Sequence, residues 1–416
     1  MFEIFRFGVF YVDTLIKMIV SMKQSIISKQ TFGNTKKTMW NVDATNAETF
    51  LLTVNKLGLK YSQLCGHFPF SFYCNEASKR EILVPKKTWL LIHMLFLIFF
   101  SISWLVLFIT SELLAGCELT TSHLGDVIWS LISMGGFTIT RIKSFYWDKK
   151  IYSLWQNLNT IHKDLQQYLF HTETNSSYLN KWSKISTYFQ HRTIYYVILT
   201  ILIFIFGGIL MQIILPALSY YKHIPDVSPL QNLINMLWIT LVIFNAGNGF
   251  LILVFMKCIT TSFENLYDSL VNHYEYSGAK NIKFIKVENA EKKGNKVPLD
   301  MDNKLLELIR IFKRLEILVD DFNAMFSFDL SVSMCATILQ VLLSSFNLIA
   351  GGEGTAVDWI LASAIMSGDV WEYANQGDQM TRWAQKVTEM FEEISFSSLH
   401  SDVQNKVKIC WISRSE

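Results

Sequence analysis

The sequence predicts an all-α membrane protein whose helices form a polytopic bundle. Hydrophobic residues make up 51% of its 416 residues and charged residues only 17%, whereas a soluble domain carries about a quarter charged residues. Aromatic residues make up 14%, which excludes a disordered chain. The net charge of +2 gives no general attraction to nucleic acid.

Six segments are expected to cross the membrane, because a spanning helix needs about 20 mainly apolar residues. Four clear apolar runs lie at 89–110, 194–215, 233–256 and 325–350. Two weaker segments are 124–140, which contains Asp126, and 356–374, which contains Asp358, Asp369 and Glu372.

The basic residues predict the orientation of these spans. Of the 37 lysines and arginines, all except Lys222 lie in the alternate segments 1–88, 141–193, 257–324 and 375–416. Cytoplasmic loops carry the excess of basic residues, so the N-terminus, both long loops and the tail are expected in the cytoplasm. Removing either weak span would move a strongly basic loop outside, and the count therefore supports both.

The same count divides the chain into three parts. Residues 1–88 form a cytoplasmic N-terminal helical segment, and residues 89–374 form the transmembrane bundle with its long cytoplasmic loops 141–193 and 257–324. Residues 375–416 form a cytoplasmic tail helix. The expected location is the plasma membrane, as a multi-pass protein.

Apolar residues recur at spacings of three and four in the cytoplasmic segments 151–168, 305–322 and 380–394, which predicts a cytoplasmic helical bundle. The middle segment continues into the span 325–350, so we expect one long helix there. Two interpretations are open: packing within the chain, and an interface that assembles several chains. The residues assigned to assembly and to this anchor are Leu305, Leu308, Phe312, Leu315, Val319 and Phe322.

Motifs of soluble enzymes are missing from the sequence. It contains no G-x-x-x-x-G-K-[ST], no G-x-S-x-G and no H-E-x-x-H. Cysteine and histidine show no metal-ligand spacing. We therefore expect neither catalysis nor a metal or cofactor.

Aromatic, sulfur-containing and amide side chains in the outer halves of the spans predict a pocket for a small, mostly apolar organic ligand. The candidate ligand-binding residues are Trp129, Met134, Met211, Gln212, Asn235, Trp238, Phe346 and Trp359. Two alternatives stay open. The polar residues could make hydrogen bonds between helices, and Trp129, Trp238 and Trp359 could be interfacial belt residues.

The pattern resembles the arthropod gustatory and odorant receptor superfamily over about residues 90–416. The resemblance rests on the basic inner loops, the heptad helix at 305–346, the stretch Phe322-Asn323-x-x-Phe326-Ser327 and the tail from Trp371 to Phe396. It favours the gustatory branch, with the odorant branch as the alternative. A transporter with a midplane substrate site is the alternative from another class, but the chain shows no internal repeat.

The resemblance implies a tetrameric ligand-gated cation channel for small organic tastants or odorants, as a homo-oligomer or with a co-receptor. It implies a cytoplasmic anchor built by the inner parts of helices four to six, and a ligand pocket in the outer half of the membrane. Members of the family have a seventh, pore-lining helix after the tail. No hydrophobic run follows residue 374 here, so we expect that helix to be absent from this chain.

Overall fold

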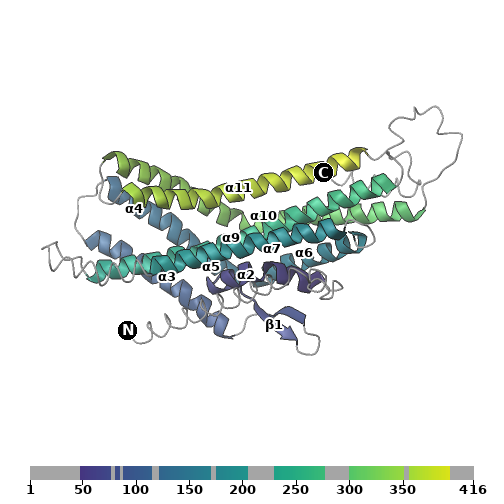
Figure 1. The fold of residues 1–416 in the computed structure, drawn as a ribbon. Coiled ribbons are helices and arrows are strands. Elements are labelled where there is room, and N and C mark those ends of the chain that lie inside the picture. The colour runs from purple at the N-terminus through teal and green to yellow at the C-terminus, as the bar shows by residue number, and fades with distance from the viewer. Residues whose placement is uncertain are drawn as a thin grey trace, which may run out of the picture.

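Long helices that run side by side make up most of the computed structural model (Figure 1). The structure describes residues 47–75, 80–84, 88–114, 121–169, 175–204, 229–276, 299–350 and 356–393. The elements are α2 (Ala47–Leu64), β1 (Ser71–Asn75), β2 (Arg80–Val84), α3 (Thr88–Leu114), α4 (Thr121–Ser130), the π-helical turn η2 (Leu131–Gly135), α5 (Gly136–Tyr146), α6 (Asp148–Leu169), α7 (Asn175–Phe204), α9 (Pro229–Tyr276), α10 (Leu299–Ala350) and α11 (Ala356–Glu393). The predicted all-α bundle is confirmed.

The segments predicted to span the membrane lie on these helices. Segment 89–110 lies in α3, 124–140 in the run α4–η2–α5, 233–256 in α9, 325–350 in α10 and 356–374 in α11. Segment 194–215 begins in α7, and its part beyond Phe204 is outside the described residues. Within the described chain, three stretches are long and apolar enough to cross a membrane: Leu90–Thr110, Gly247–Asn272 and Lys304–Phe346.

Helix α10 is one unbroken helix of 52 residues, so the predicted continuity of 305–322 with 325–350 is confirmed. At about 1.5 Å per residue it is roughly 78 Å long, more than twice the ~30 Å hydrocarbon core of a bilayer. Helices α9 and α11 are also too long to be spans alone, with 48 and 38 residues. Each must therefore project beyond the membrane.

A small antiparallel hairpin follows α2 and was not predicted. Its strands pair Ser71 with Val84 and Asn75 with Arg80. Gly66 has φ of +78° where α2 ends, a left-handed conformation that favours glycine at a helix C-terminus. The hairpin lies at the edge of the bundle beside α2 (Figure 1).

Helix α9 is the centre of the bundle. From Phe250 to Met256 every side chain is at most 4% exposed, so this part of α9 is covered on all sides. The helices that contact α9 include α2, α3, α6, α7, α10 and α11. A helix that is apolar on all sides is typically buried, and α9 is apolar at every position from Phe250 to Met256.

The predicted apolar stripes pack against this centre. Leu305, Leu308, Phe312, Leu315 and Phe322 are buried within the chain, and Val319 packs partly buried against the same core. The ring of Phe312 lies 6.2 Å from that of Phe263 on α9 and 5.5 Å from that of Phe391 on α11. The stripe of α10 therefore contributes to packing within the chain; its role between chains stays a prediction.

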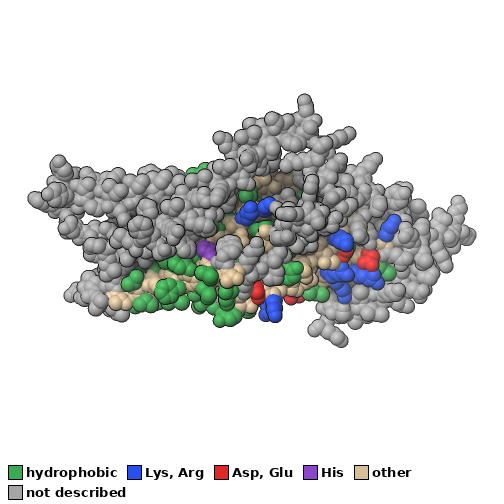
Figure 2. All heavy atoms as spheres, turned by 90° about the horizontal axis from the view of Figure 1, so that it is seen from below, with side chains coloured by type: hydrophobic (Ala, Val, Ile, Leu, Met, Phe, Trp, Pro, Cys, Tyr) green, Lys and Arg blue, Asp and Glu red, His purple; other side chains and the backbone are tan. Residues whose placement is uncertain are grey.

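The surface is divided along the long axis. On the face shown in Figure 2, hydrophobic side chains gather toward one end, whereas most charged ones lie at the middle and the other end. Large apolar side chains are exposed along α3, for example Ile92, Phe99 and Val106. Exposed apolar side chains on an apolar helix suit contact with lipid.

A glycine of α9 lies in close contact with α11. A Cβ added at Gly249 would lie 2.1 Å from the hydroxyl oxygen of Tyr373 on α11, whereas one at Gly377 would meet nothing nearer than Met256 Cε at 3.8 Å. A methyl group at Gly249 would therefore force the buried side chain of Tyr373 to move, whereas one at Gly377 would not.

We predict that Gly249→Ala destabilises the fold by about 1–3 kcal/mol through overpacking. Gly377→Ala, the matched control on the facing helix, should be neutral or stabilising by up to about 1 kcal/mol, because alanine is the better helix former. The midpoint of thermal unfolding of the detergent-purified protein measures both. Equal behaviour of the two variants would contradict the close approach.

Candidate functional site

The structure places the predicted ligand-binding residues on several helices. Trp129 lies at the end of α4 and Met134 in η2, and both are buried; Phe346 on α10 is 44% exposed. Asn235 and Trp238 lie on α9 and Trp359 on α11. Met211 and Gln212 are outside the described residues.

Trp129 and Met134 belong to different contacts, although they are close in sequence. The indole Nε1 of Trp129 donates to the carbonyl oxygen of Ala336 at 3.1 Å, which joins α4 to α10. Met134 packs with Trp104 of α3, and partly buried Phe100 and Phe108 lie against this pair. The aromatic and sulfur-rich character expected of a ligand site is thus present around Met134.

Three polar side chains join α10 to α11 in the predicted outer half of the bundle. Gln340 donates to Ser344 at 3.3 Å, and Ser363 of α11 donates to Ser344 at 2.7 Å. Gln340 is a polar residue within the predicted span 325–350. The spacing of four between Gln340 and Ser344 could have indicated their contact, but nothing in the sequence places Ser363 beside them.

Glycines set the distance between α4, α5 and α10. A Cβ at Gly125 would lie 2.3 Å from Leu343, and one at Gly136 would lie 2.4 Å from Val332. The π-helical turn η2 separates these two contacts. Such turns inside α-helices are frequent at functional sites.

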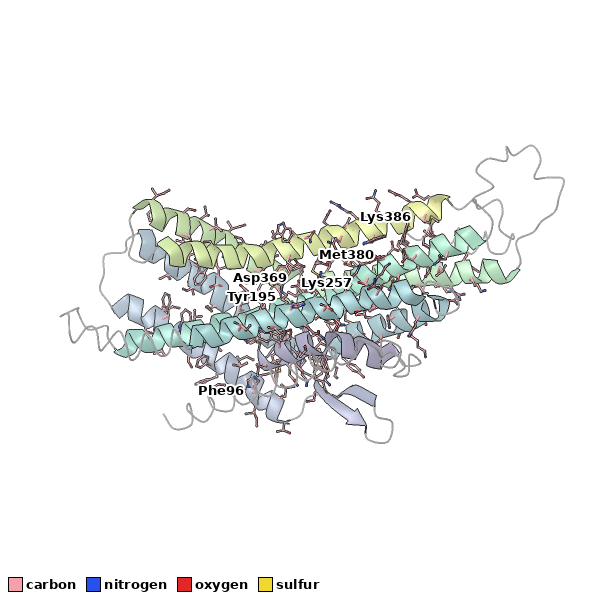
Figure 3. All side chains as sticks on the ribbon, in the orientation of Figure 1. Phe96, Tyr195, Lys257, Asp369, Met380 and Lys386 are labelled. Carbon is pink, nitrogen blue, oxygen red and sulfur yellow. The ribbon has the colours of Figure 1, made fainter. Side chains whose placement is uncertain are left out.

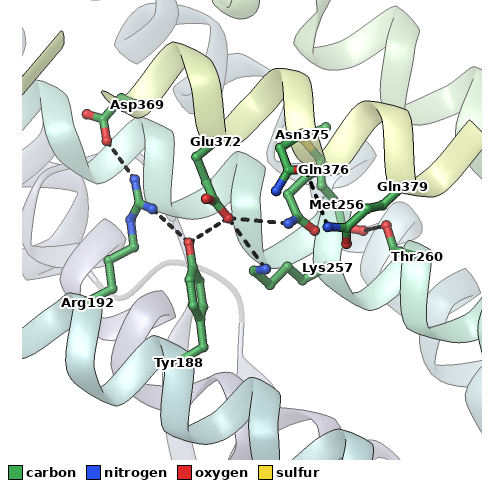
Figure 4. A network of polar contacts seen from close by, with 10 residues as sticks. All are labelled: Tyr188, Arg192, Met256, Lys257, Thr260, Asp369, Glu372, Asn375, Gln376 and Gln379. Atoms are coloured by element: carbon green, nitrogen blue, oxygen red, sulfur yellow. Dashed lines mark hydrogen bonds and ion pairs between the residues drawn. The ribbon is translucent and has the colours of Figure 1, made fainter. Parts of the chain in front are cut away.

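A polar network of described residues joins α7, α9 and α11 near the middle of the long axis (Figures 3 and 4). Arg192 of α7 makes an ion pair with Asp369 of α11 at 2.6 Å. Lys257 of α9 lies 3.5 Å from Glu372 of α11. Two cations from two helices thus match two carboxylates of a third.

Tyr188 connects the two ion pairs. Its hydroxyl donates to Glu372 at 3.0 Å and accepts from Arg192 at 2.7 Å, and Lys257 lies 4.0 Å above its ring. Burial raises the pKa of Tyr188 above its ordinary value, so the hydroxyl keeps the proton that it donates. Gln376 adds a further donor to Glu372 at 3.3 Å.

Of this network, the sequence indicates only the two carboxylates: Asp369 and Glu372 are acidic residues within a weak predicted span. It assigns no role to Arg192, Lys257 or Tyr188. A signal did exist: the predicted inner ends of three spans lie at residues 194, 256 and 374, which indicates that charged side chains next to these positions lie at the same depth. Among the described residues, no group of three or more His, Cys, Asp or Glu could hold a metal ion.

We predict that Arg192→Gln lowers stability by about 1–3 kcal/mol, because it leaves the half-buried carboxylate of Asp369 without its charged donor. The charge exchange Arg192→Asp with Asp369→Arg should recover part of this loss. The control is Arg382→Gln, whose pair with Asp378 is 72% and 52% exposed and should contribute little. Thermal unfolding in detergent checks the series; equal losses at Arg192 and Arg382 would contradict a stabilising network.

Comparison with known proteins assigns the family. The family model described as "7tm Chemosensory receptor" matches residues 56–400, which covers all the described helices from within α2 to α11. No curated protein matches the chain. The long helices, the apolar surface at one end and this match agree: the chain belongs to the 7tm chemosensory receptor family.

Proposed function

We propose that this chain is a subunit of a ligand-gated cation channel of the plasma membrane, opened by small organic molecules and closer to gustatory than to odorant receptors. Membership of the chemosensory receptor family supports the receptor role. The observation that carries the proposal further is the continuity of α10 and α11. Both helices run unbroken from the predicted ligand-binding half to the predicted cytoplasmic bundle.

The proposed ligand site is the outer-half junction of α3, η2 and α10. Met134, Trp104 and the phenylalanines beside them offer apolar and polarizable contacts. Ser344 and Ser363 are hydroxyl groups at the contact of α10 with α11, where a ligand could exchange hydrogen bonds. Such a mixture suits a small organic molecule with few polar groups.

In this proposal, a ligand bound against α10 changes the position of α10 relative to α11, to which it is joined through Ser344 and Ser363. The change reaches the ion pairs of Asp369 and Glu372, which lie along the same helix as Ser363. A receptor of this kind responds because the ligand binds one arrangement of the helices better than the other.

Ligand-evoked current tests the function. The full chain is expressed in oocytes, alone and with a second member of the family, and a panel of tastants and odorants is applied under voltage clamp. We expect a cation current for at least one compound. Uptake of a labelled compound without current would instead favour the transporter alternative.

Met134→Leu keeps the side-chain volume but removes the sulfur, and we expect it to shift the half-maximal concentration roughly threefold or more. Ile92→Ala changes an exposed side chain of α3 and is the matched control, with an unchanged response. Surface labelling shows that both variants reach the membrane. An unaltered response in Met134→Leu would argue against the proposed site.

Assembly into a complex of four chains belongs to the same proposal. Ile317 is 58% exposed on the predicted cytoplasmic part of α10, where lipid cannot cover it. We predict that Ile317→Asp lowers the fraction of oligomer in detergent, as measured by mass photometry, while thermal unfolding of the single chain is unchanged. Thr160→Asp, on the exposed face of α6, should leave the oligomer intact, and an equal effect of both would remove Ile317 from the interface.

A further inference from the structure

The corner between α5 and α6 carries exposed aromatic and basic side chains together. We define the α5–α6 corner as Lys143, Tyr146, Trp147, Lys149 and Lys150. Helix α5 ends at Tyr146, and Trp147 leaves helical geometry with φ of −98° and ψ of 21° before α6 begins at Asp148. The corner is therefore fixed by regular structure on both sides.

The apolar surface of the run α4–η2–α5 ends at this corner. Ile128, Leu131 and Ile139 are exposed along it, and Tyr146 is 73% exposed at its end. Lys149 and Lys150 follow at once and are exposed. Tyrosine and tryptophan gather where hydrocarbon meets water, so the corner marks the level of the lipid headgroups.

Two ammonium groups lie near one indole ring. Lys143 Nζ is 4.8 Å and Lys150 Nζ is 4.3 Å from the ring centre of Trp147. These contacts bring the lysine side chain of α6 back toward α5, the direction in which side chains of a helix tilt. The ammonium of Lys150 is thereby held toward the headgroup level.

The charges of Lys149 and Lys150 are available to a ligand. Lys143 is matched by Asp329 of α10 at 3.4 Å, whereas no ion pair joins Lys149 or Lys150 to an acidic side chain in the described part of the chain. Asp148, the acidic residue next to Lys149 in the sequence, accepts from the backbone N–H of Lys149 at 2.8 Å. Two exposed ammonium groups thus lie beside an apolar surface that ends in aromatic rings.

We infer that the α5–α6 corner binds the headgroup of an anionic phospholipid. The phosphate and any further negative group would contact Lys149 and Lys150. The acyl chains would lie on the exposed apolar surface above, which includes Ile139 and, on α10, Phe328. The distribution of basic residues predicts that this corner faces the cytoplasmic leaflet, which is the leaflet that carries anionic lipids.

The inference goes beyond receptor function and is tested without a tastant. The full chain, purified in detergent, is titrated with dioctanoyl phosphatidylserine, and binding is followed by thermophoresis; dioctanoyl phosphatidylcholine is the neutral comparison. We expect saturable binding of the serine lipid and little binding of the choline lipid. The variant Lys149→Gln with Lys150→Gln should bind the serine lipid about 25-fold more weakly, since each lysine near an anionic headgroup contributes about a factor of five.

The matched control is Lys163→Gln, an exposed lysine farther along α6, which should bind as the unaltered chain does. Thermal unfolding without lipid confirms that each variant is folded, which is expected because all three lysines are exposed. Unchanged affinity in the double variant, or an equal loss in Lys163→Gln, would overturn the assignment. Binding of free phosphoserine as tightly as the lipid would also overturn it, because the apolar surface would then contribute nothing.

Discussion

The full enclosure of α9 is the constraint on which the bundle depends. A helix that other helices cover on all sides has no face left for polar groups, so it must be apolar throughout or provide each polar group with a partner. From Phe250 to Met256 the helix is apolar throughout. The next residue, Lys257, is charged and has partners: its ammonium group lies near the carboxylate of Glu372 and over the ring of Tyr188. Close approach of the neighbours also requires small residues, which explains Gly249 opposite Tyr373.

Much of the fold could be predicted from the sequence because lipid and water impose strong patterns. Long apolar runs identified the helices, and the spacing from Leu305 to Phe322 identified the buried face of α10. Other features had weaker signals. The β1–β2 hairpin contains only five residues per strand, and the π-helical turn η2 differs from an α-helix by one residue, which composition cannot reveal.

The candidate site was less predictable, because its residues come together through packing between helices. Trp129 and Met134 were chosen by depth and side-chain type, yet one bonds to α10 and the other packs on α3. Asp369 and Glu372 were visible as acidic residues in a span, but their partners on α7 and α9 required knowledge of which helices are neighbours. Periodicity tells which face of a helix is buried; it does not tell what covers that face.

The π-helical turn η2 has a consequence for chain length. An extra residue turns everything after it by about 100° relative to a continuous α-helix, so η2 determines which face of α5 meets α10. Gly136 at that contact leaves room for Val332. If α5 were rotated about its axis, a residue with a larger side chain would lie at this position instead. An insertion or deletion within 131–135 would therefore turn α5 out of its contact with α10, although no charged residue or loop marks the place. In this part of the receptor, the contact between helices depends on the number of residues as well as on their identity.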